Sequence, residues 1–226
     1  NTATQVVSVV DTTAPVISVP ADVTEEATSK SDTSVSIGKA EATDAIKVES
    51  ITNDAPKSFP LGETTITWTA TDSSGNISTA TQKVTVQDTT KPTIATPTDV
   101  TQEATSASDN TVELSTPKAT DAVSDTTVTS DAPETFDLGE HVITWTATDE
   151  SGNSATITQK ITITDTTKPT IATPADITQE ATSKLENAVK LDAPQVTDNV
   201  GVQSVTNDAP QSFPIGNTTV TWTATD

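Results

Sequence analysis

The sequence predicts an all-β protein built from β-sandwiches that follow one another in a linear array. The 226 residues include 51 Thr, and Thr, Val and Ile are β-branched residues that favour extended, half-buried strands. The 7 Gly and 13 Pro recur at fixed places along the chain. Similar segments return every 77 residues, which is close to the size of a small independent β-sandwich.

The repeat needs no gap anywhere along the chain. The segment Asp-Thr-Thr-x-Pro begins at Asp11, Asp88 and Asp165, and each repeat has one Trp at the same place. We therefore divide the chain as follows: a leader that has the pattern of a last strand (1–10), two complete repeats (11–87 and 88–164) and a third repeat that lacks a counterpart of the last strand (165–226).

Alternation of apolar and polar residues predicts the strands of the second repeat. A first strand spans 94–100 with a kink at Pro97, and further strands lie at 112–114 and 123–128. A long strand at 142–147 and a last strand at 157–163 flank Glu-Ser-Gly-Asn, which is typical of a hairpin. With Trp and Ile facing inward and Thr outward, the pattern indicates a sandwich of about seven strands.

Charge and composition exclude several classes of function. Asp and Glu number 32 against 11 basic residues, all of them Lys, and the formal net charge is −21. Such a chain is repelled by nucleic-acid phosphates and by anionic lipids. Without Cys, and with His141 as the single His, it offers no thiol chemistry, no Cys-ligated zinc and no Ser-His-Asp triad. No nucleophile–base pair recurs and no apolar run approaches the roughly 18 residues of a membrane span, so we expect neither an enzyme nor a membrane span in this segment.

One stretch of each repeat resembles a known family. Residues 59–76 have the pattern Phe-Pro-x-Gly-x-Thr-x-Ile-Thr-Trp-Thr-Ala-Thr-Asp-x-Ser-Gly-Asn, which resembles the hyalin repeat (HYR), and the resemblance covers essentially the whole chain. It implies an immunoglobulin-like extracellular module used in adhesion and surface proteins. Animal members carry a Cys pair at places that correspond to the neighbourhood of Val19 and Ala80, so the resemblance favours a prokaryotic surface protein.

The immunoglobulin-like fold implied by the resemblance brings four acidic residues to each junction between repeats. In such a fold, one end of the domain contains its entry point, the loop before the third strand and the last hairpin. Asp88, Asp121 and Asp149 lie in these three places and should therefore be close together. Glu26 of the preceding repeat should end near them, much as in cadherin-like arrays. Ca²⁺ takes about six to eight oxygen ligands, and carbonyls or water can complete the set. We predict calcium here and at the next junction, where the equivalent residues are Glu103, Asp165, Asp198 and Asp226.

A second interpretation of these carboxylates is local. An Asp at a turn caps its own backbone, and residues 72–76 form a good Asx-type turn without any ion. Packing several carboxylates together without a cation is costly, which favours calcium. Separately, the sequons at Asn76 and Asn217 permit N-glycosylation in a host with that machinery.

The leader has the sequence of a last strand. Residues 1–10 align with 78–87, so Val7 and Val9 correspond to Val84 and Val86. If the leader of one subunit completes the third repeat of the next, strand donation satisfies an otherwise exposed sheet edge. The alternative is a piece of a longer continuous array whose two ends fall in the same loop. Both alternatives give a linear filament of head-to-tail sandwiches.

These observations indicate a structural role. We expect an extracellular filament, a pilus-like fibre, a stalk, or a surface-layer or adhesin shaft whose junctions are stiffened by calcium. The alternative is a spacer or carbohydrate-binding module of a secreted protein, which an exposed aromatic strip would favour. The expected partners are copies of the chain itself or further repeats of it.

Overall fold

The computed structural model describes residues 1–226 and confirms the all-β prediction. No helix in it is long and apolar enough to cross a membrane. Its contacts divide the chain into two compact units. The first contains residues 1–94, 118–128 and 147–155, and the second contains residues 95–117, 129–146 and 156–226. The junction between the first and second repeats therefore lies inside the first unit, and the junction between the second and third repeats lies inside the second unit.

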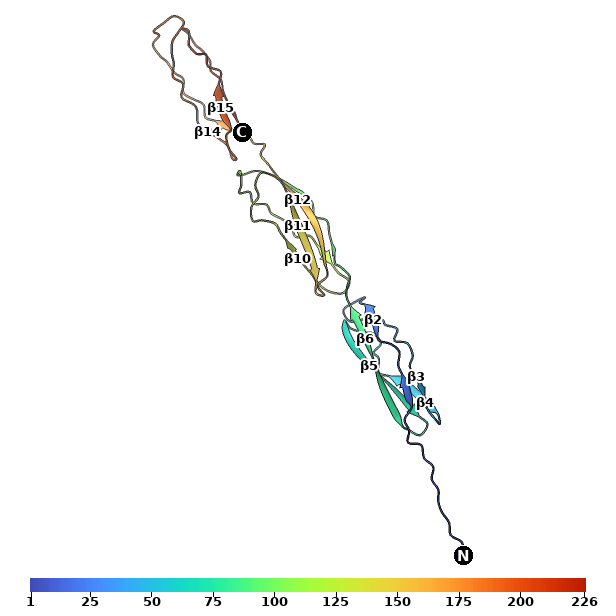
Figure 1. Cartoon of the computed structure of the whole chain (residues 1–226). Coiled ribbons are helices and arrows are strands. Elements are labelled where there is room, and N and C mark those ends of the chain that lie inside the picture. Colours follow the sequence, from blue (N-terminus) through green and yellow to red (C-terminus); the bar gives the residue numbers. More distant parts are fainter. The chain divides into compact units, whose positions relative to one another are not determined.

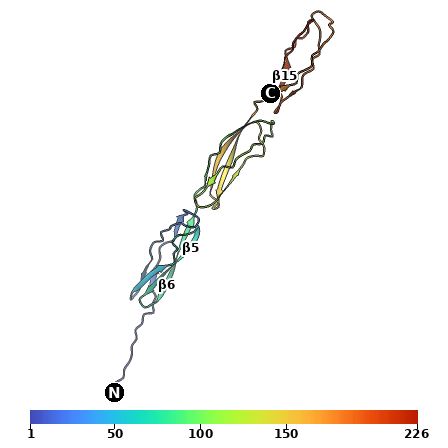
Figure 2. The same ribbon diagram turned by 180° about the vertical axis from the view of Figure 1, so that it is seen from behind.

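The first repeat forms a four-stranded sheet and a two-stranded sheet. In the larger sheet the strand order is β2-β6-β5-β4, with β6 parallel to β2 and antiparallel to β5. The long strands β5 and β6 lie side by side in both views of the molecule (Figures 1 and 2). The smaller sheet pairs β1 with β3. The strands are β1 (Val16–Ser18), β2 (Val23–Glu26), β3 (Glu41–Thr43), β4 (Val48–Asn53), β5 (Gly62–Asp72) and β6 (Ile77–Gln87).

The second repeat has the same topology. Its larger sheet has the order β10-β11-β12-β8, with β12 parallel to β8, and its smaller sheet pairs β7 with β9. In each complete repeat the last strand is thus a central strand of the sheet. The strands are β7 (Thr93–Ile94), β8 (Val100–Glu103), β9 (Ala119–Thr120), β10 (Thr126–Ser130), β11 (Gly139–Asp149) and β12 (Ser154–Thr164).

The third repeat has four short strands in two pairs. The pairs are β13 (Thr170–Ile171) with β14 (Val196–Thr197), and β15 (Ser204–Asn207) with β16 (Trp222–Thr225). No hydrophobic side chain of residues 165–226 is buried. Residues 1–10 form no strand and are exposed, and Figure 1 shows them leading away from the strands of the first unit.

Three strand predictions for the second repeat are wrong in detail. The expected strand at 94–100 is two strands, β7 and β8, which belong to different sheets on either side of Pro97. Proline lacks a backbone N–H and cannot continue a ladder through that position. Residues 112–114 form no strand, and the strand expected at 123–128 begins only at Thr126 as β10. The strand at 119–120 was not predicted.

The two long strands and the hairpin between them are confirmed. Residues 142–147 and 157–163 lie within β11 and β12. Gly152 has φ of 91° in the hairpin, a backbone conformation that glycine adopts without steric cost. The inward direction is also confirmed for Trp68, which is 5% exposed, and Trp145, which is 4% exposed, whereas Trp222 is only partly buried.

In each of the two complete repeats, a buried Gln connects the Trp to the rest of its sandwich. The Nε1 of Trp68 donates a hydrogen bond of 3.0 Å to Oε1 of Gln82, and Gln82 Nε2 donates to the carbonyls of Ala21 and Ile37. Trp145 and Gln159 form the same pair at 2.9 Å. A buried polar side chain is stable only when its hydrogen bonds are made. The Gln therefore fixes two irregular segments that have no ladder of their own.

Candidate metal centre

Three Asp side chains meet at the same place in each repeat. One belongs to the Asp-Thr-Thr linker, one to the turn before the strand equivalent to β10, and one ends the long strand equivalent to β11. Within each group, one carboxylate oxygen from each Asp lies within 4.8 Å of the corresponding oxygens of the other two. The groups are Asp11, Asp44 and Asp72; Asp88, Asp121 and Asp149; and Asp165, Asp198 and Asp226.

The third Asp of each group is held by the hairpin that follows it. Asp149 Oδ1 accepts the backbone N–H of Asn153 at 2.8 Å, and Oδ2 accepts the side-chain amide of Asn153 at 3.0 Å. Burial raises the pKa of Asp149, but these bonds, with those from the backbone of Gly152 and Ser151, outweigh it and lower the pKa below its usual value. Asp149 is therefore a buried carboxylate that stays ionised.

The other two Asp side chains of this group also accept hydrogen bonds, Asp121 from its own turn and Asp88 from the hairpin. Asp121 Oδ1 accepts the backbone N–H groups of Val123 and Ser124 at 2.8 and 3.2 Å. Asp88 Oδ2 accepts the Ser151 hydroxyl at 2.8 Å, which ties the linker to the hairpin. The local turn chemistry expected from the sequence is thus present, and it orients all three carboxylates toward one another.

The electrostatics of the groups favour a cation. Asp88 and Asp149 are buried, and three like charges at this separation repel one another unless a positive charge offsets them. In the third group, Asp198 Oδ2 is buried and has no hydrogen-bond partner. A buried carboxylate oxygen without a partner is costly, and a hard cation would satisfy it. The oxygen-only donor set is the type that Ca²⁺ prefers.

Glu26 and Glu103 lie outside the groups to which we had assigned them. Glu26 Oε1 and Oε2 accept the backbone N–H and the hydroxyl of Thr89, both at 2.8 Å, and Oε1 also accepts the Thr90 hydroxyl. Glu103 binds Thr166 and Thr167 in the same way. Both pKa values are lowered, first by the backbone hydrogen bond from the linker Thr, and that of Glu103 falls to about 2. We call this arrangement the Glu–Thr clamp.

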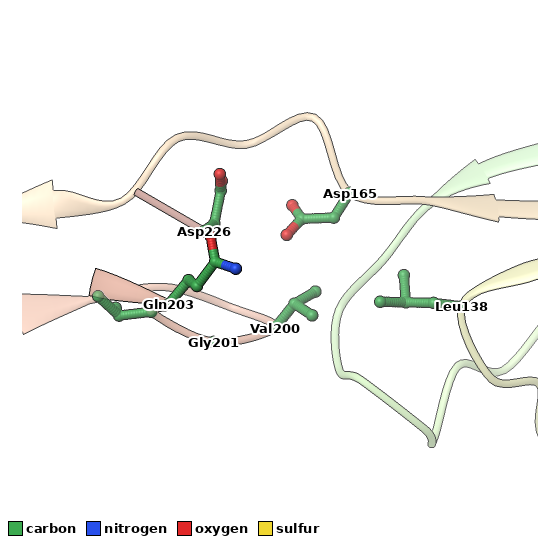
Figure 3. Close-up of a pocket in the computed structure, with 7 residues that line it drawn as sticks. Leu138, Asp165, Val200, Gly201, Gln203 and Asp226 are labelled. Carbon is green, nitrogen blue, oxygen red and sulfur yellow. The ribbon is translucent and has the colours of Figure 1, made fainter. Parts of the chain in front are cut away.

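An apolar contact accompanies the first clamp. Val123, which follows the Asp121 turn, belongs to the same buried cluster as Ala27 and Phe59 of the first repeat and is only 6% exposed. The equivalent Ile46 of the first repeat is 67% exposed. In the second unit, Val200 and Leu138 line a cavity of about 520 Å³ together with Asp165 and Asp226 (Figure 3). Figure 3 shows the Val200 side chain directed at Leu138.

Comparison with protein families identifies the repeats. The HYR domain model matches residues 10–86, 87–163 and 164–226. The chain belongs to the HYR domain family. The resemblance expected from residues 59–76 is confirmed, whereas a prokaryotic source stays a prediction.

Relatives of this HYR chain include two sea-urchin proteins named hyalin. The chain is 34% identical to hyalin of Strongylocentrotus purpuratus over 96% of its own length and 20% of that protein. It is 34% identical to hyalin of Lytechinus variegatus over 94% of its own length and 44% of that protein. The HYR chain thus spans less than half the length of either relative.

Two solved structures with tandem domains are also similar to this HYR chain. Drosophila N-cadherin EC1-4 is 15% identical with a TM-score of 0.36, covering 68% of this chain and 50% of that one. Sidekick-1 immunoglobulin domains 1-4 are 13% identical with a TM-score of 0.38, covering 67% and 49%. Scores this low add nothing to the fold and site described above.

One Asp group of the HYR chain was missed from the sequence. Asp11, Asp44 and Asp72 form it in the first repeat, with Asp72 almost fully buried. The period itself carried the signal, because each of these residues lies 77 positions before a predicted ligand. We had looked for ligands only where two repeats of the chain meet, yet the three Asp residues of every group come from one HYR domain and its own linker.

The other predicted site residues differ in their surroundings. Asn76 Nδ2 donates to Asp72 Oδ2 at 2.8 Å and to the carbonyls of Asp11 and Thr13 at 3.3 Å, so it is part of the turn that holds the first Asp group. Asn217 is exposed. Val7 and Val9 are 77% and 92% exposed.

Proposed function

We propose that the chain is a structural segment of an extracellular protein, in which HYR domains form the shaft of a stalk, filament, surface layer or adhesin and Ca²⁺ binds the Asp groups. The observation that carries the proposal is the recurrence of one junction. The linker Asp, the turn Asp and the strand-end Asp return every 77 residues with no inserted spacer, and the Glu–Thr clamp returns with them. Repetition of the same contact suits a load-bearing array, in which each domain has the same role.

The extracellular location is supported by the family. The resemblance to the hyalin repeat implies an extracellular module, and the chain matches that family along its length. The absence of Cys is compatible with this location, because buried Trp–Gln pairs stabilise the two complete domains without disulfides.

The proposed role of Ca²⁺ is to neutralise the three carboxylates of a group. Asp88 of the linker would then be fixed to Asp121 and Asp149 of the domain that it enters. Three carboxylates supply part of the roughly six to eight oxygens that the ion requires, and carbonyls or water supply the rest. Because the linker Asp is followed directly by the two clamped Thr residues, an ion at this point would restrict the junction.

The alternative, a carbohydrate-binding module, has less support. Sugar sites use exposed aromatic rings, whereas Trp68 and Trp145 are buried and hydrogen-bonded to Gln side chains. No aromatic strip is available on the two complete domains.

The proposal is tested by comparing the chain with its Asp121→Asn variant. Removing one ligand should lower the melting temperature in Ca²⁺, because a ligand that binds only the folded state stabilises it. A chelator should abolish the difference between the two proteins. Asp125→Asn is the matched control, since Asp125 is an exposed acid in the same loop but outside the Asp group.

Small-angle scattering of the same proteins tests the structural part. We expect an elongated particle of three domains in Ca²⁺ and a broader distribution of shapes in chelator or in Asp121→Asn. A compact particle would contradict the shaft. Melting curves that are identical with and without chelator would leave only the turn-capping interpretation of the Asp residues.

A further inference from the structure

Three segments of the second repeat meet at its junction with the first repeat, and side chains join them to one another. Ser124 Oγ accepts the backbone N–H of Glu150 at 3.2 Å, which connects the Asp121 turn to the hairpin. The Ser151 hydroxyl donates to Asp88 at 2.8 Å, which connects the hairpin to the linker. A displacement of one segment would therefore break bonds to the others. We call the three segments together the docking end, which consists of residues 88–90, 121–125 and 149–153.

Each segment of the docking end contacts the first repeat by a different kind of interaction. In the linker, the Thr89 backbone N–H and hydroxyl bind Glu26 in the Glu–Thr clamp. In the turn, Val123 belongs to the buried apolar cluster of the first repeat. In the hairpin, Glu150 Oε2 accepts a hydrogen bond of 2.7 Å from Lys30 Nζ. The first repeat thus holds all three segments at once.

The apolar contact contributes most to this docking. The Lys30 and Glu150 side chains are 65% and 51% exposed, and an ion pair in water adds little. The bonds of the clamp are charge-assisted, and they fix the position of the linker. Val123 is only 6% exposed, and burying one Val side chain changes an equilibrium constant by at least about tenfold.

The docking end packs with the first repeat and not only with its own sandwich. Residues 118–128 and 147–155 belong to the same compact unit as the first repeat, whereas the remainder of the second repeat belongs to the other unit. The long strands β11 and β12 contain residues of both units. They are also the two central strands of the larger sheet of the second repeat. Opening of the first repeat would therefore release the ends of the strands on which the second sheet depends.

We infer that the first repeat supports the folding of the second through this docking end, and that the two complete repeats unfold as one cooperative unit. When the first repeat opens, Val123 becomes exposed to water, and the linker, turn and hairpin lose their fixed contacts. The folding equilibrium constant of the second repeat should then fall by at least about tenfold. Each domain shares its stability with its neighbour, as in arrays that are stabilised by nearest-neighbour interfaces. This coupling goes beyond the proposed structural role, because it needs neither Ca²⁺ nor an extracellular location.

The transfer of destabilisation from one repeat to the other tests this coupling. Each complete repeat has one buried Trp, Trp68 in the first and Trp145 in the second. With 5-fluorotryptophan in the full chain, the two ¹⁹F signals follow the unfolding of the two repeats separately in urea. The signals are assigned with Trp68→Phe and Trp145→Phe. The measurement is made in chelator, so that a failure of the calcium proposal leaves the result unaffected.

Ile51→Ala destabilises the first repeat at a distance from the docking end. Ile51 pairs with Ala70, close to Asp72 at the end of β5, whereas Lys30 accepts a backbone hydrogen bond from Leu61 just before β5 begins. Near the midpoint of unfolding, the variant should lower the ratio of folded to unfolded chain by about tenfold at Trp68 and equally at Trp145. An independent first repeat would lower it at Trp68 alone.

Disruption of the docking end provides the matched comparison. In a chain with Val123→Ala and Glu26→Gln, Ile51→Ala should still affect Trp68 but leave Trp145 almost unchanged. Val142→Ala with Glu113→Gln is the control pair, since both side chains are exposed and lie outside the docking end, and the transfer to Trp145 should persist in it.

A second change in the first repeat makes the result independent of one position. Ile17→Ala shortens a partly buried side chain of β1, in the smaller sheet, and should also be felt at Trp145. The coupling is overturned if Ile51→Ala and Ile17→Ala lower the folded ratio at Trp68 and leave Trp145 unchanged. It is overturned equally if the transfer to Trp145 is undiminished in the chain with Val123→Ala and Glu26→Gln.

Discussion

Glu103 accepts the backbone N–H of Thr166 at 2.8 Å, 63 residues along the chain. The same oxygen accepts the Thr167 hydroxyl, while the second oxygen accepts the Thr166 hydroxyl. The carboxylate thus holds the two residues that connect one HYR domain to the next. Since the hydrogen bonds favour the ionised form, they lower the pKa of Glu103 from 4.5 to about 2.

The clamp predicts a pH dependence of stability. Because the folded-state pKa of Glu103 is below its unfolded value, its contribution is fully present above pH 4.5 and is lost as the pH falls toward about 2. We therefore expect Glu103→Gln to lower the melting temperature at neutral pH, and the difference from the unchanged chain to vanish near pH 2. Thermal unfolding in chelator measures this. Glu113→Gln is the control, since Glu113 is exposed and makes no side-chain hydrogen bond. A difference that is constant with pH would contradict the clamp.

The Val123 contact predicts that shortening Val123 to Ala destabilises the chain more than shortening its counterpart Ile46 to Ala. Val123→Ala removes apolar groups from a buried cluster and should lower the free energy of unfolding by about 1–2 kcal/mol. Ile46→Ala removes more atoms at the equivalent place, but from an exposed side chain, and should change it by less than about 0.5 kcal/mol. Urea unfolding of the two variants distinguishes them. Equal effects would show that Val123 is not a structural contact.

The two sequons are expected to differ in modification. The Asn76 amide nitrogen donates to oxygens of Asp11, Thr13 and buried Asp72, which share its two N–H groups, and a glycan on that nitrogen would disrupt these bonds. Asn217 is exposed and has no such role. In a glycosylating host, mass spectrometry of tryptic peptides should find the glycan at Asn217 and not at Asn76. Full occupancy of Asn76 in folded protein would contradict the turn geometry.

The sequence predicted those parts of the fold that depend on local periodicity. The long strands β11 and β12 were found because alternation of Thr with apolar residues marks their inward faces. The sheet order was not found, because pairing between β8 and β12 joins residues about sixty positions apart and leaves no local pattern. Residues 112–114 were predicted as a strand because the sequence shows the alternation of Val112 and Leu114 with polar residues. The sequence does not show that this segment has no neighbouring strand to pair with.

The candidate site was predicted in part. Asp88, Asp121 and Asp149 were brought together correctly, since the immunoglobulin-like topology places their loops at one pole. Glu26 does end at the junction, as its strand direction predicted, but hydroxyls and backbone N–H groups of the linker Thr residues supply its hydrogen bonds, and it is not in the Asp group. The packing of Val123 against the first repeat was not predicted either. A Val that follows a turn has the same sequence pattern whether it begins a strand or packs against another domain.

Calorimetric titration with Ca²⁺ tests the central claim most directly. The account predicts saturable binding at three sites, one for each Asp group, in the full chain. Asp44→Asn, Asp121→Asn and Asp198→Asn should each remove one site, and Asp125→Asn should remove none. If the chain shows no saturable binding, or if the three variants bind as many ions as the unchanged chain, the Asp groups are turn caps and not metal centres.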